Sequence, residues 1–533
     1  MLNPKIISPL KFNQNTKGAL LKRVIPLSII IGLLICYKYF VEISYEITFP
    51  VPNTPNTPVV PVVTNIPITT NVNNNDEVNN INTDPLFTEK HEYKFRVKLD
   101  EIKAVYQVMD IIRIIIEPRH PSLANKLDST FFRVTITGTT IFTPQLVSSS
   151  NSSVLVYEAP LMDKGNYIVQ ARLIFYDYKE IYSFESPETL DPKSSPKVEK
   201  IDRVIVNGDF RFKVEQSPIW ERLKPELPYS CSDISILRGR WSGDLSRFIP
   251  YSCIIPNYPK KPSLELEISK KGSFRYTWIR FLGDSNTRRL FFKLKSRLGA
   301  SCDAMIQDGQ NKDKITQAFC KVNYTETEFL GEKDSRPREV YLTFEWYYPG
   351  SRYSLETLLD NTFEQSCKLH DKCVKNIQCD FSNQKNSNTT KNICPTKLAD
   401  QTFISIGSHT PGWNVDRIDN YLGKVFQQIH ENYREKITFI TTNVVNIHNI
   451  PNYYTNQYLI RNNIRITKAN EILRKYVDNS QKDGYNIDLL DFFGTTQPIW
   501  EYSADAVHYQ DRVYYEQARL VLDRLVSYIK TIH

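Results

Sequence analysis

Two short motifs carry residue types that could do chemistry together. Gly283-Asp284-Ser285 occurs once, and Asp505-Ala506-Val507-His508 stands near the end of the chain. A serine hydroxyl becomes a nucleophile when a histidine takes its proton, and a carboxylate on the other ring nitrogen fixes the histidine tautomer. Residues three apart on a tight turn face one way, and none of the other seven of the eight histidines has an aspartate at that spacing. The pattern predicts a nucleophilic Ser285, with His508 as base and Asp505 as its partner.

The elements around Ser285 suit this role. Residues 276–282 form an apolar run typical of a strand, and apolar residues repeat at helical spacing over 287–298. A serine in the turn between them lies at a helix N-terminus, where free N–H groups and the macrodipole favour an oxyanion. The alternative is that Ser285 only caps the helix, as serines commonly do.

Further alternation of strands and helices follows Ser285. The pattern predicts strands at 401–406, 437–445 and 487–493, and helices at 415–433, 456–477 and 514–529. This order is typical of an α/β domain with a mostly parallel sheet, in which ligands bind beyond the carboxyl ends of strands. Gly407-Ser408-His409 follows the strand at 401–406, so we expect Ser285 and His409 at the same edge.

An all-β domain is predicted before the catalytic region, over residues 88–185. Apolar and charged residues alternate from Tyr93 to Leu99, as they do in strands with one buried face. The step from Asp163 through Gly165 to Tyr167 resembles the tyrosine corner of immunoglobulin-like sandwiches.

The N-terminal region is predicted to anchor the chain. Residues 24–41 are almost entirely apolar, and the basic residues stand before them in the tail 1–23. The positive-inside rule then gives a single-pass type II topology, with the bulk of the chain lumenal or extracellular. A cleaved signal peptide is the alternative, but no small-x-small site follows the apolar run. Residues 42–87, rich in Pro, Asn and Thr, are predicted to be a stalk.

The cysteines agree with an oxidising compartment. Beyond Cys36 in the predicted anchor there is an even number, which predicts disulfides: Cys231, Cys253, Cys302, Cys320, Cys367, Cys373, Cys379 and Cys394. Three Asn-x-Ser/Thr sites also follow the anchor, at Asn151, Asn323 and Asn388. The alternative for Cys367-x-x-His370-x-x-Cys373 is a zinc cluster. We expect disulfides there and no metal site.

Length and charge narrow the function further. A chain of 533 residues is expected to form two or more domains. Its net charge of +8 is mild for this length and forms no basic stripe interleaved with aromatics, so nucleic acid is not an expected partner.

Taken in order, Gly283-Asp284-Ser285, Gly407-x-His409 and Asp505-x-x-His508 resemble the PC-esterase branch of the GDSL/SGNH hydrolases. The segment 186–270 contains Arg238-Gly239-Arg240-Trp241 between Cys231 and Cys253. It looks like the Cys/Trp-rich lead-in of the NXPE family and, more distantly, of trichome-birefringence-like proteins. The NXPE family joins an immunoglobulin- or filamin-type sandwich to a PC-esterase domain, here 271–533. Most SGNH members carry Asn where this chain has His409.

The resemblance implies a three-layer SGNH-type α/β fold and acyl-ester chemistry on glycans, with no bound cofactor. Ser285 would take the acyl group from a donor such as acetyl-CoA, and Gly283, Asp284, Gly407 and His409 would line the oxyanion or substrate site. A sugar hydroxyl attacking the acyl-serine would make the protein an O-acetyltransferase of the Golgi, the ER or the cell surface. Attack by water would make it an esterase. A third class is a non-catalytic surface protein whose degenerate esterase domain binds glycan or protein.

Overall fold

The computed structural model describes residues 90–178 (apart from 102, 104 and 149–152), 200–218, 230–257 (apart from 236), 276–307, 315–323, 339–348, 355–360, 398–446 (apart from 433 and 434) and 461–531. The predicted tail, anchor and stalk all lie outside them. In this part of the chain no helix is both long and apolar enough to cross a membrane. All described residues belong to one compact unit, Asp84–His533.

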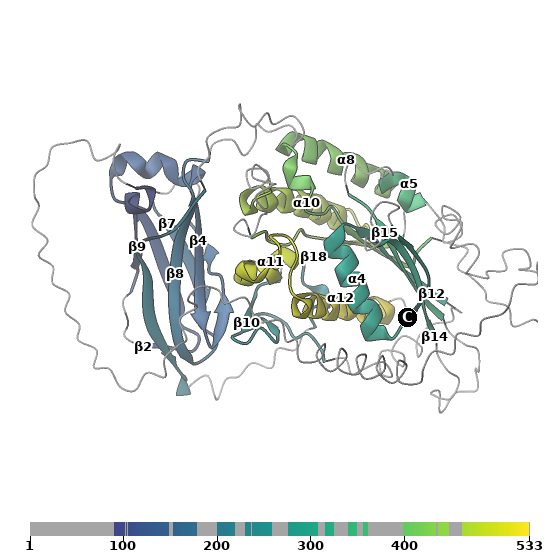
Figure 1. The fold of residues 1–533 in the computed structure, drawn as a ribbon, viewed down its shortest axis with the longest axis horizontal. Coiled ribbons are helices and arrows are strands. Elements are labelled where there is room, and N and C mark those ends of the chain that lie inside the picture. The colour runs from purple at the N-terminus through teal and green to yellow at the C-terminus, as the bar shows by residue number, and fades with distance from the viewer. Residues whose placement is uncertain are drawn as a thin grey trace, which may run out of the picture. The chain divides into compact units, whose positions relative to one another are not determined.

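The N-terminal part of this unit, up to Glu215, is built mainly from strands (Figure 1). Its elements are η1 (His91–Lys94), β1 (Phe95–Leu99), β2 (Val105–Gln107), β3 (Ile111–Pro118), η2 (Pro121–Ser129), β4 (Phe131–Gly138), β5 (Thr140–Phe142), β6 (Gln145–Leu146), β7 (Leu155–Pro160), β8 (Gly165–Phe175) and β9 (Lys200–Glu215). Strands β6, β7, β3 and β1 pair in that order, β9, β8, β4 and β5 form a second series, and β1 meets β9. The rings of Phe95 in β1 and Phe132 in β4 lie 4.9 Å apart, so the two series pack face to face as a sandwich.

Two sequence expectations can be compared with this sandwich. Burial along β1 alternates as predicted, with Phe95 and Val97 inside. The Tyr167 hydroxyl donates to the carbonyl of Asp163 at 3.0 Å, the contact that a tyrosine corner makes.

The predicted end of the sandwich, at residue 185, is too early. Strand β9 lies in the segment assigned to the lead-in, yet it pairs along β8. Two register shifts interrupt this pairing, and Asp202 and Asn207 have positive φ within β9. Such irregularities break the period-two alternation by which a strand is recognised.

The lead-in connects the sandwich to the α/β domain. It contains η4 (Cys231–Asp233), β10 (Gly239–Ser242) and β11 (Phe248–Pro250), and β10 pairs with β5 of the sandwich. Trp241 in β10 is fully buried and donates to the carbonyl of Thr495 at 2.7 Å. This contact joins the lead-in to the region just after the last strand.

The α/β domain contains a mixed sheet of seven strands among the described residues, in the order β13-β14-β15-β12-β16-β17-β18. Their bounds are β12 (Tyr276–Gly283), β13 (Ser301–Gln307), β14 (Ile315–Asn323), β15 (Glu339–Trp346), β16 (Gln401–Ser405), β17 (Lys436–Ile440) and β18 (Ile487–Leu490). Strands β15, β12, β16, β17 and β18 are mutually parallel. The antiparallel β13 and β14 extend the sheet beyond β15.

Helices cover both faces of the sheet (Figure 1). The helical elements are α4 (Ser285–Leu298), α5 (Leu355–Asp360), η6 (Thr410–Gly412), α8 (Val415–Asn432), α10 (Asn463–Lys482), α11 (Phe492–Thr496), η9 (Gln497–Tyr502) and α12 (Asp511–Thr531). Phe281 of β12 packs in one core with α4 and α12, and the next residue, Leu282, packs in another with α5, α8 and α10. The sequence therefore correctly predicts a layered α/β domain.

Four of the cysteines predicted to form disulfides do so, in the pairs Cys231–Cys253 and Cys302–Cys320. The other four predicted cysteines, Cys367, Cys373, Cys379 and Cys394, lie outside the described residues, as do Asn151 and Asn388. Asn323 is the last residue of β14.

Candidate active site

Ser285 is the first residue of α4, directly beyond the carboxyl end of β12. The helix is capped by Asp284, whose carboxylate accepts a hydrogen bond from the N–H of Asn286 at 3.0 Å. The alternative that Ser285 is the cap is therefore wrong. Its hydroxyl is left for other partners, beside the N–H groups and positive dipole end of α4.

Asp505 and His508 lie on a tight loop between η9 and α12. Ser503 and Tyr509 form a β-bridge that closes the loop. The loop is also tied to the residues after β17, because Asn446 donates its N–H to the carbonyl of Ala506 at 2.7 Å. Ala506 has φ of 73°, which turns the chain so that the aspartate faces the histidine.

The structure brings Ser285, Asp505 and His508 into one hydrogen-bonded chain. His508 Nε2 lies 2.6 Å from Ser285 Oγ, and His508 Nδ1 lies 2.8 Å from Asp505 Oδ2. Asp505 Oδ1 also accepts from the backbone N–H of His508 at 2.9 Å. The side chain of His508 is 17% exposed and that of Asp505 is 49% exposed. With Asp505 accepting from Nδ1–H, Nε2 is free to accept the serine proton.

Asn286, next to Ser285, is also held from the α12 side. The Tyr514 hydroxyl donates to Asn286 Oδ1 at 2.6 Å. Burial raises the pKa of Tyr514 far above its usual value, so the hydroxyl remains a donor. This bond fixes the first turn of α4 against the helix that follows His508.

Asp284 does not lie where the sequence interpretation placed it. Its carboxylate is fully buried rather than facing substrate. Oδ2 accepts from the N–H of Ser408 at 2.9 Å and from the Ser408 hydroxyl at 3.0 Å. Gly283 is likewise buried, and a Cβ there would lie 2.2 Å from Thr287 Oγ1. These two residues therefore shape the backbone of the site and do not line it.

Gly407 makes the contact between the turn after β12, which contains Asp284, and the loop after β16. It has φ of 74°, and a Cβ there would lie 2.9 Å from Asp284 Oδ2. The Thr442 hydroxyl donates to the Gly407 carbonyl at 3.1 Å. The loop after β16 is thus fixed from both sides.

His409, the expected oxyanion donor, is partly buried at the end of this loop. Its Nδ1 lies 2.8 Å from Nη2 of Arg461, and its ring centre lies 4.8 Å from that of Tyr348. Sequence reasoning missed both neighbours. Arg461 is 52 residues away along the chain and belongs to no motif, so only the folded structure shows the contact.

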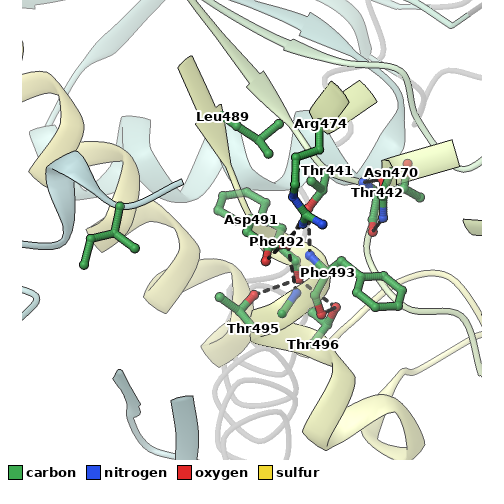
Figure 2. A network of polar contacts seen from close by, with 12 residues as sticks. Thr441, Thr442, Asn470, Arg474, Leu489, Asp491, Phe492, Phe493, Thr495 and Thr496 are labelled. Carbon is green, nitrogen blue, oxygen red and sulfur yellow. Dashed lines mark hydrogen bonds and ion pairs between the residues drawn. The ribbon is translucent and has the colours of Figure 1, made fainter. Parts of the chain in front are cut away.

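A polar network behind these loops, also missed from the sequence, is centred on buried Asp491 (Figure 2). Asp491 Oδ1 accepts from the Thr441 hydroxyl and from the N–H of Gly494, each at 3.1 Å. Burial raises the pKa of Asp491, while Arg474 and these donors oppose that rise. The network joins the ends of β17 and β18.

Asn470 of α10 holds the backbone of Thr442, the residue next to Thr441 of this network. Its side chain accepts from the N–H of Thr442 at 3.0 Å and donates to the carbonyl of Thr442 at 3.2 Å. Since Thr442 in turn holds Gly407, the helix α10 fixes two loops of the site.

A small cavity lies behind Asp284, lined partly by Ser405, Asn443 and Gln517. Its volume is about 10 Å³, room for roughly one water molecule. This cavity is too small for an acyl ester, and Ser285 is not among its lining residues. Among the described residues, no group of three or more His, Cys, Asp or Glu could hold a metal ion; Cys367 and His370 are outside them.

Comparisons with known proteins add the following. No family model matches the chain, and no curated protein matches it. It is similar in structure to a peptidoglycan O-acetylesterase, at 10% identity and a TM-score of 0.28, over 51% of this chain and 97% of the other. It is also similar to a lipase/acylhydrolase from Enterococcus faecalis, at 14% identity and a TM-score of 0.25, over 47% of this chain and 96% of the other.

Proposed function

We propose that this protein is a serine-dependent acyl-ester enzyme of the GDSL/SGNH type, and that it transfers acetyl groups to glycan hydroxyls. The observation that carries the proposal is the hydrogen-bonded chain from Asp505 through His508 to Ser285, with 2.6 Å between His508 Nε2 and Ser285 Oγ. A serine, histidine and aspartate connected in this way act as nucleophile, base and orienting carboxylate on several unrelated folds.

In the first half-reaction Ser285 Oγ attacks the carbonyl carbon of an acyl ester or thioester donor, such as acetyl-CoA. The hydroxyl proton moves to His508 Nε2, and Asp505 holds the resulting imidazolium at Nδ1. As the tetrahedral intermediate collapses, the bond to the donor breaks, and the proton on His508 passes to the departing alcohol or thiol. Ser285 is left as an acetyl ester.

In the second half-reaction a sugar hydroxyl gives its proton to His508 Nε2 and attacks the carbonyl carbon of the acyl-serine. As the ester bond to Ser285 breaks, His508 passes that proton to Ser285 Oγ, and the sugar leaves as an acetyl ester. The backbone N–H of Ser285 and the ring N–H of His409 stabilise the oxyanion in both halves. One such donor contributes about 10²–10³ in kcat, so His409→Ala should cost about that factor.

The wider setting belongs to the same proposal. The paired cysteines of the described region support an oxidising compartment, because disulfides are rare in the cytosol. The Tyr167 contact supports an immunoglobulin- or filamin-type sandwich, as in the NXPE family. We infer a type II protein, anchored by residues 24–41 in the Golgi, the ER or the cell surface and glycosylated at its Asn-x-Ser/Thr sites.

The test is to incubate purified protein with an activated acetyl ester and to look for an adduct by mass spectrometry of its peptides. We expect one acetyl group on Ser285 in wild-type protein and none in Ser285→Ala. His508→Ala and the double variant Ser285→Ala/His508→Ala should both lack turnover, because a catalytic triad acts as a unit. An adduct at another residue, or turnover retained in Ser285→Ala, would show that the mechanism is wrong.

A second measurement separates transferase from esterase. Acetylated wild-type protein is mixed with a sugar acceptor or with buffer alone, and loss of the adduct is followed in time. Faster loss with transfer to the sugar supports the transferase. Equal loss indicates an esterase, and absence of any adduct indicates the non-catalytic binding protein.

A further inference from the structure

The ring of His409 is held by a contact that the proposed mechanism does not yet use. Nη2 of Arg461 lies 2.8 Å from His409 Nδ1. A guanidinium carries N–H donors and no acceptor, so in this contact Arg461 donates and Nδ1 accepts. An imidazole whose Nδ1 accepts carries its one proton on Nε2. His409 is then neutral, and Nε2–H is its single donor.

The backbone under the ring is fixed independently. Asp284 holds Ser408 and Thr442 holds Gly407, both directly before His409. The ring itself is packed by Tyr348, with the two ring planes 31° apart. Backbone and packing set where the imidazole lies, but neither distinguishes its two nitrogens. The bond from Arg461 is the one among these contacts that does.

Arg461 is in turn placed by the start of α10. Asn462, the next residue, caps this helix by accepting from the N–H groups of Ile464 and Arg465, both at 3.1 Å. The Arg465 guanidinium donates to the carbonyl of Pro411 at 2.6 Å, so the helix start is tied to the segment that follows His409. The segments that carry Arg461 and His409 are thus joined by the bond from Arg465 to Pro411 as well as by the contact between their own side chains.

We propose that Arg461 is a positioning residue: it fixes His409 as the neutral Nε2–H tautomer, so that this nitrogen can donate to the oxyanion formed at Ser285. This inference rests on the proposed acyl-serine function for its catalytic consequence, but the tautomer itself does not depend on any activity. The proton of a neutral histidine can lie on either ring nitrogen, so a histidine that donates from Nε2 needs a neighbour that fixes its tautomer. An asparagine needs none, because its N–H₂ group is always a donor.

The first experiment reads the tautomer directly. Protein labelled with ¹⁵N-histidine is studied by NMR, and the His409 signals are assigned by their loss in His409→Ala. We expect Nδ1 unprotonated and Nε2 protonated in the wild type, and a mixture of tautomers in Arg461→Met. In Arg461→Glu the carboxylate accepts a bond, so Nδ1 should become protonated. A protonated Nδ1 in the wild type, or an unchanged spectrum in both variants, would overturn the inference.

The second experiment reads the consequence for turnover. Arg461→Met should lower kcat towards the level of His409→Ala, about 10²-fold below wild type, with little change in KM. The double variant should be no slower than His409→Ala, because Arg461 acts through His409. Additive losses, or wild-type kcat in Arg461→Met, would contradict the positioning role. Arg297→Met is the matched control, since Arg297 stacks on Tyr515 at the far end of α4, and it should leave kcat and the His409 spectrum unchanged.

The two readouts separate the two claims. If Ser285→Ala still forms the adduct while the His409 spectrum responds to Arg461, the proposed function fails and the tautomer assignment stands. If Ser285 is acylated as expected while the spectrum ignores Arg461, only the positioning role fails.

Discussion

Replacing Asp284 with Asn tests whether this residue holds the site together or contacts substrate. The buried carboxylate accepts from Asn286 at Oδ1 and twice from Ser408 at Oδ2. These donors offset the cost of burying its charge. In Asp284→Asn one oxygen can still cap α4, but the amide N–H₂ then faces the N–H of Ser408, and two donors cannot bond.

The magnitude follows from these contacts. A hydrogen bond to a charged group is worth about 1.5–3 kcal/mol, and the Ser408 hydroxyl can turn to accept from the new amide. One bond is therefore lost, and Asp284→Asn should lower the free energy of unfolding by about 2–3 kcal/mol. Asp284→Ala also loses the cap, a further ~1 kcal/mol. Because the Gly407–His409 loop loses its anchor, kcat should fall in both variants.

The assay is urea unfolding of the purified protein, followed by fluorescence, alongside turnover of an activated ester. Asp511→Asn is the matched control, because that carboxylate is 76% exposed and pairs with Lys293 at 2.6 Å. A surface ion pair of this kind contributes at most about 1 kcal/mol. If Asp284→Asn kept wild-type stability while kcat fell, the carboxylate would act on substrate and the structural role argued here would be refuted.

Two other perturbations change stabilising contacts outside the candidate triad. Burial lowers the pKa of His430 below 6.5, so its contribution to stability is present above pH 6.5 and is lost as pH falls through the lowered pKa. In His430→Gln, urea midpoints should fall less between about pH 7.5 and about pH 5 than in wild type; equal falls would contradict this. Arg133 of the sandwich lies 4.0 Å from the Trp500 ring centre and 2.6 Å from Glu501 Oε1. Arg133→Ala should cost about 2 kcal/mol, from a cation–π contact and a half-exposed ion pair, and an unchanged urea midpoint would exclude it.

The parts of the fold that were predicted are those with an uninterrupted local pattern. Helix α8 was expected over 415–433 and spans Val415–Asn432, and the strand expected over 401–406 is β16, Gln401–Ser405. Helix α8 buries apolar side chains at helical spacing, and the short strand β16 buries the apolar pair Phe403 and Ile404, so the hydrophobic pattern reveals both. Strands β13 and β14 were not predicted. Strand β14 pairs with β13 and with β15 near the sheet edge, and the register shifts between β13 and β14 weaken the alternation.

The residues of the candidate site also fall into those that a local sequence pattern reveals and those that only the folded structure reveals. Ser285, Asp505 and His508 were found because two short sequence motifs contain them, and the residue types and spacing of these motifs suggest a nucleophile, a base and its carboxylate partner. Arg461 and Tyr348 were not found, because an arginine or a tyrosine is ordinary at any surface and becomes informative only beside His409. Asp284 was found but misassigned, since a carboxylate beside a nucleophile suggests catalysis until its complete burial is seen.

The placement of Asp284 also explains why the motifs occur together. Strands β12 and β16 are neighbours in the sheet although a long stretch of chain separates them. After β12 the chain builds the sheet on one side, and from β16 onwards on the other side. The loops that follow β12 and β16 therefore lie side by side at the point where the strand order reverses. Asp284, after β12, needs a neighbour with no side chain, and Gly407, after β16, provides it, because a Cβ there would lie 2.9 Å from the carboxylate. One turn therefore serves two purposes. Asp284 turns inward to hold the loop that carries His409, and Ser285, the next residue, turns outward to meet His508. In Gly-Asp-Ser the aspartate therefore has a structural role, and the serine is the candidate nucleophile.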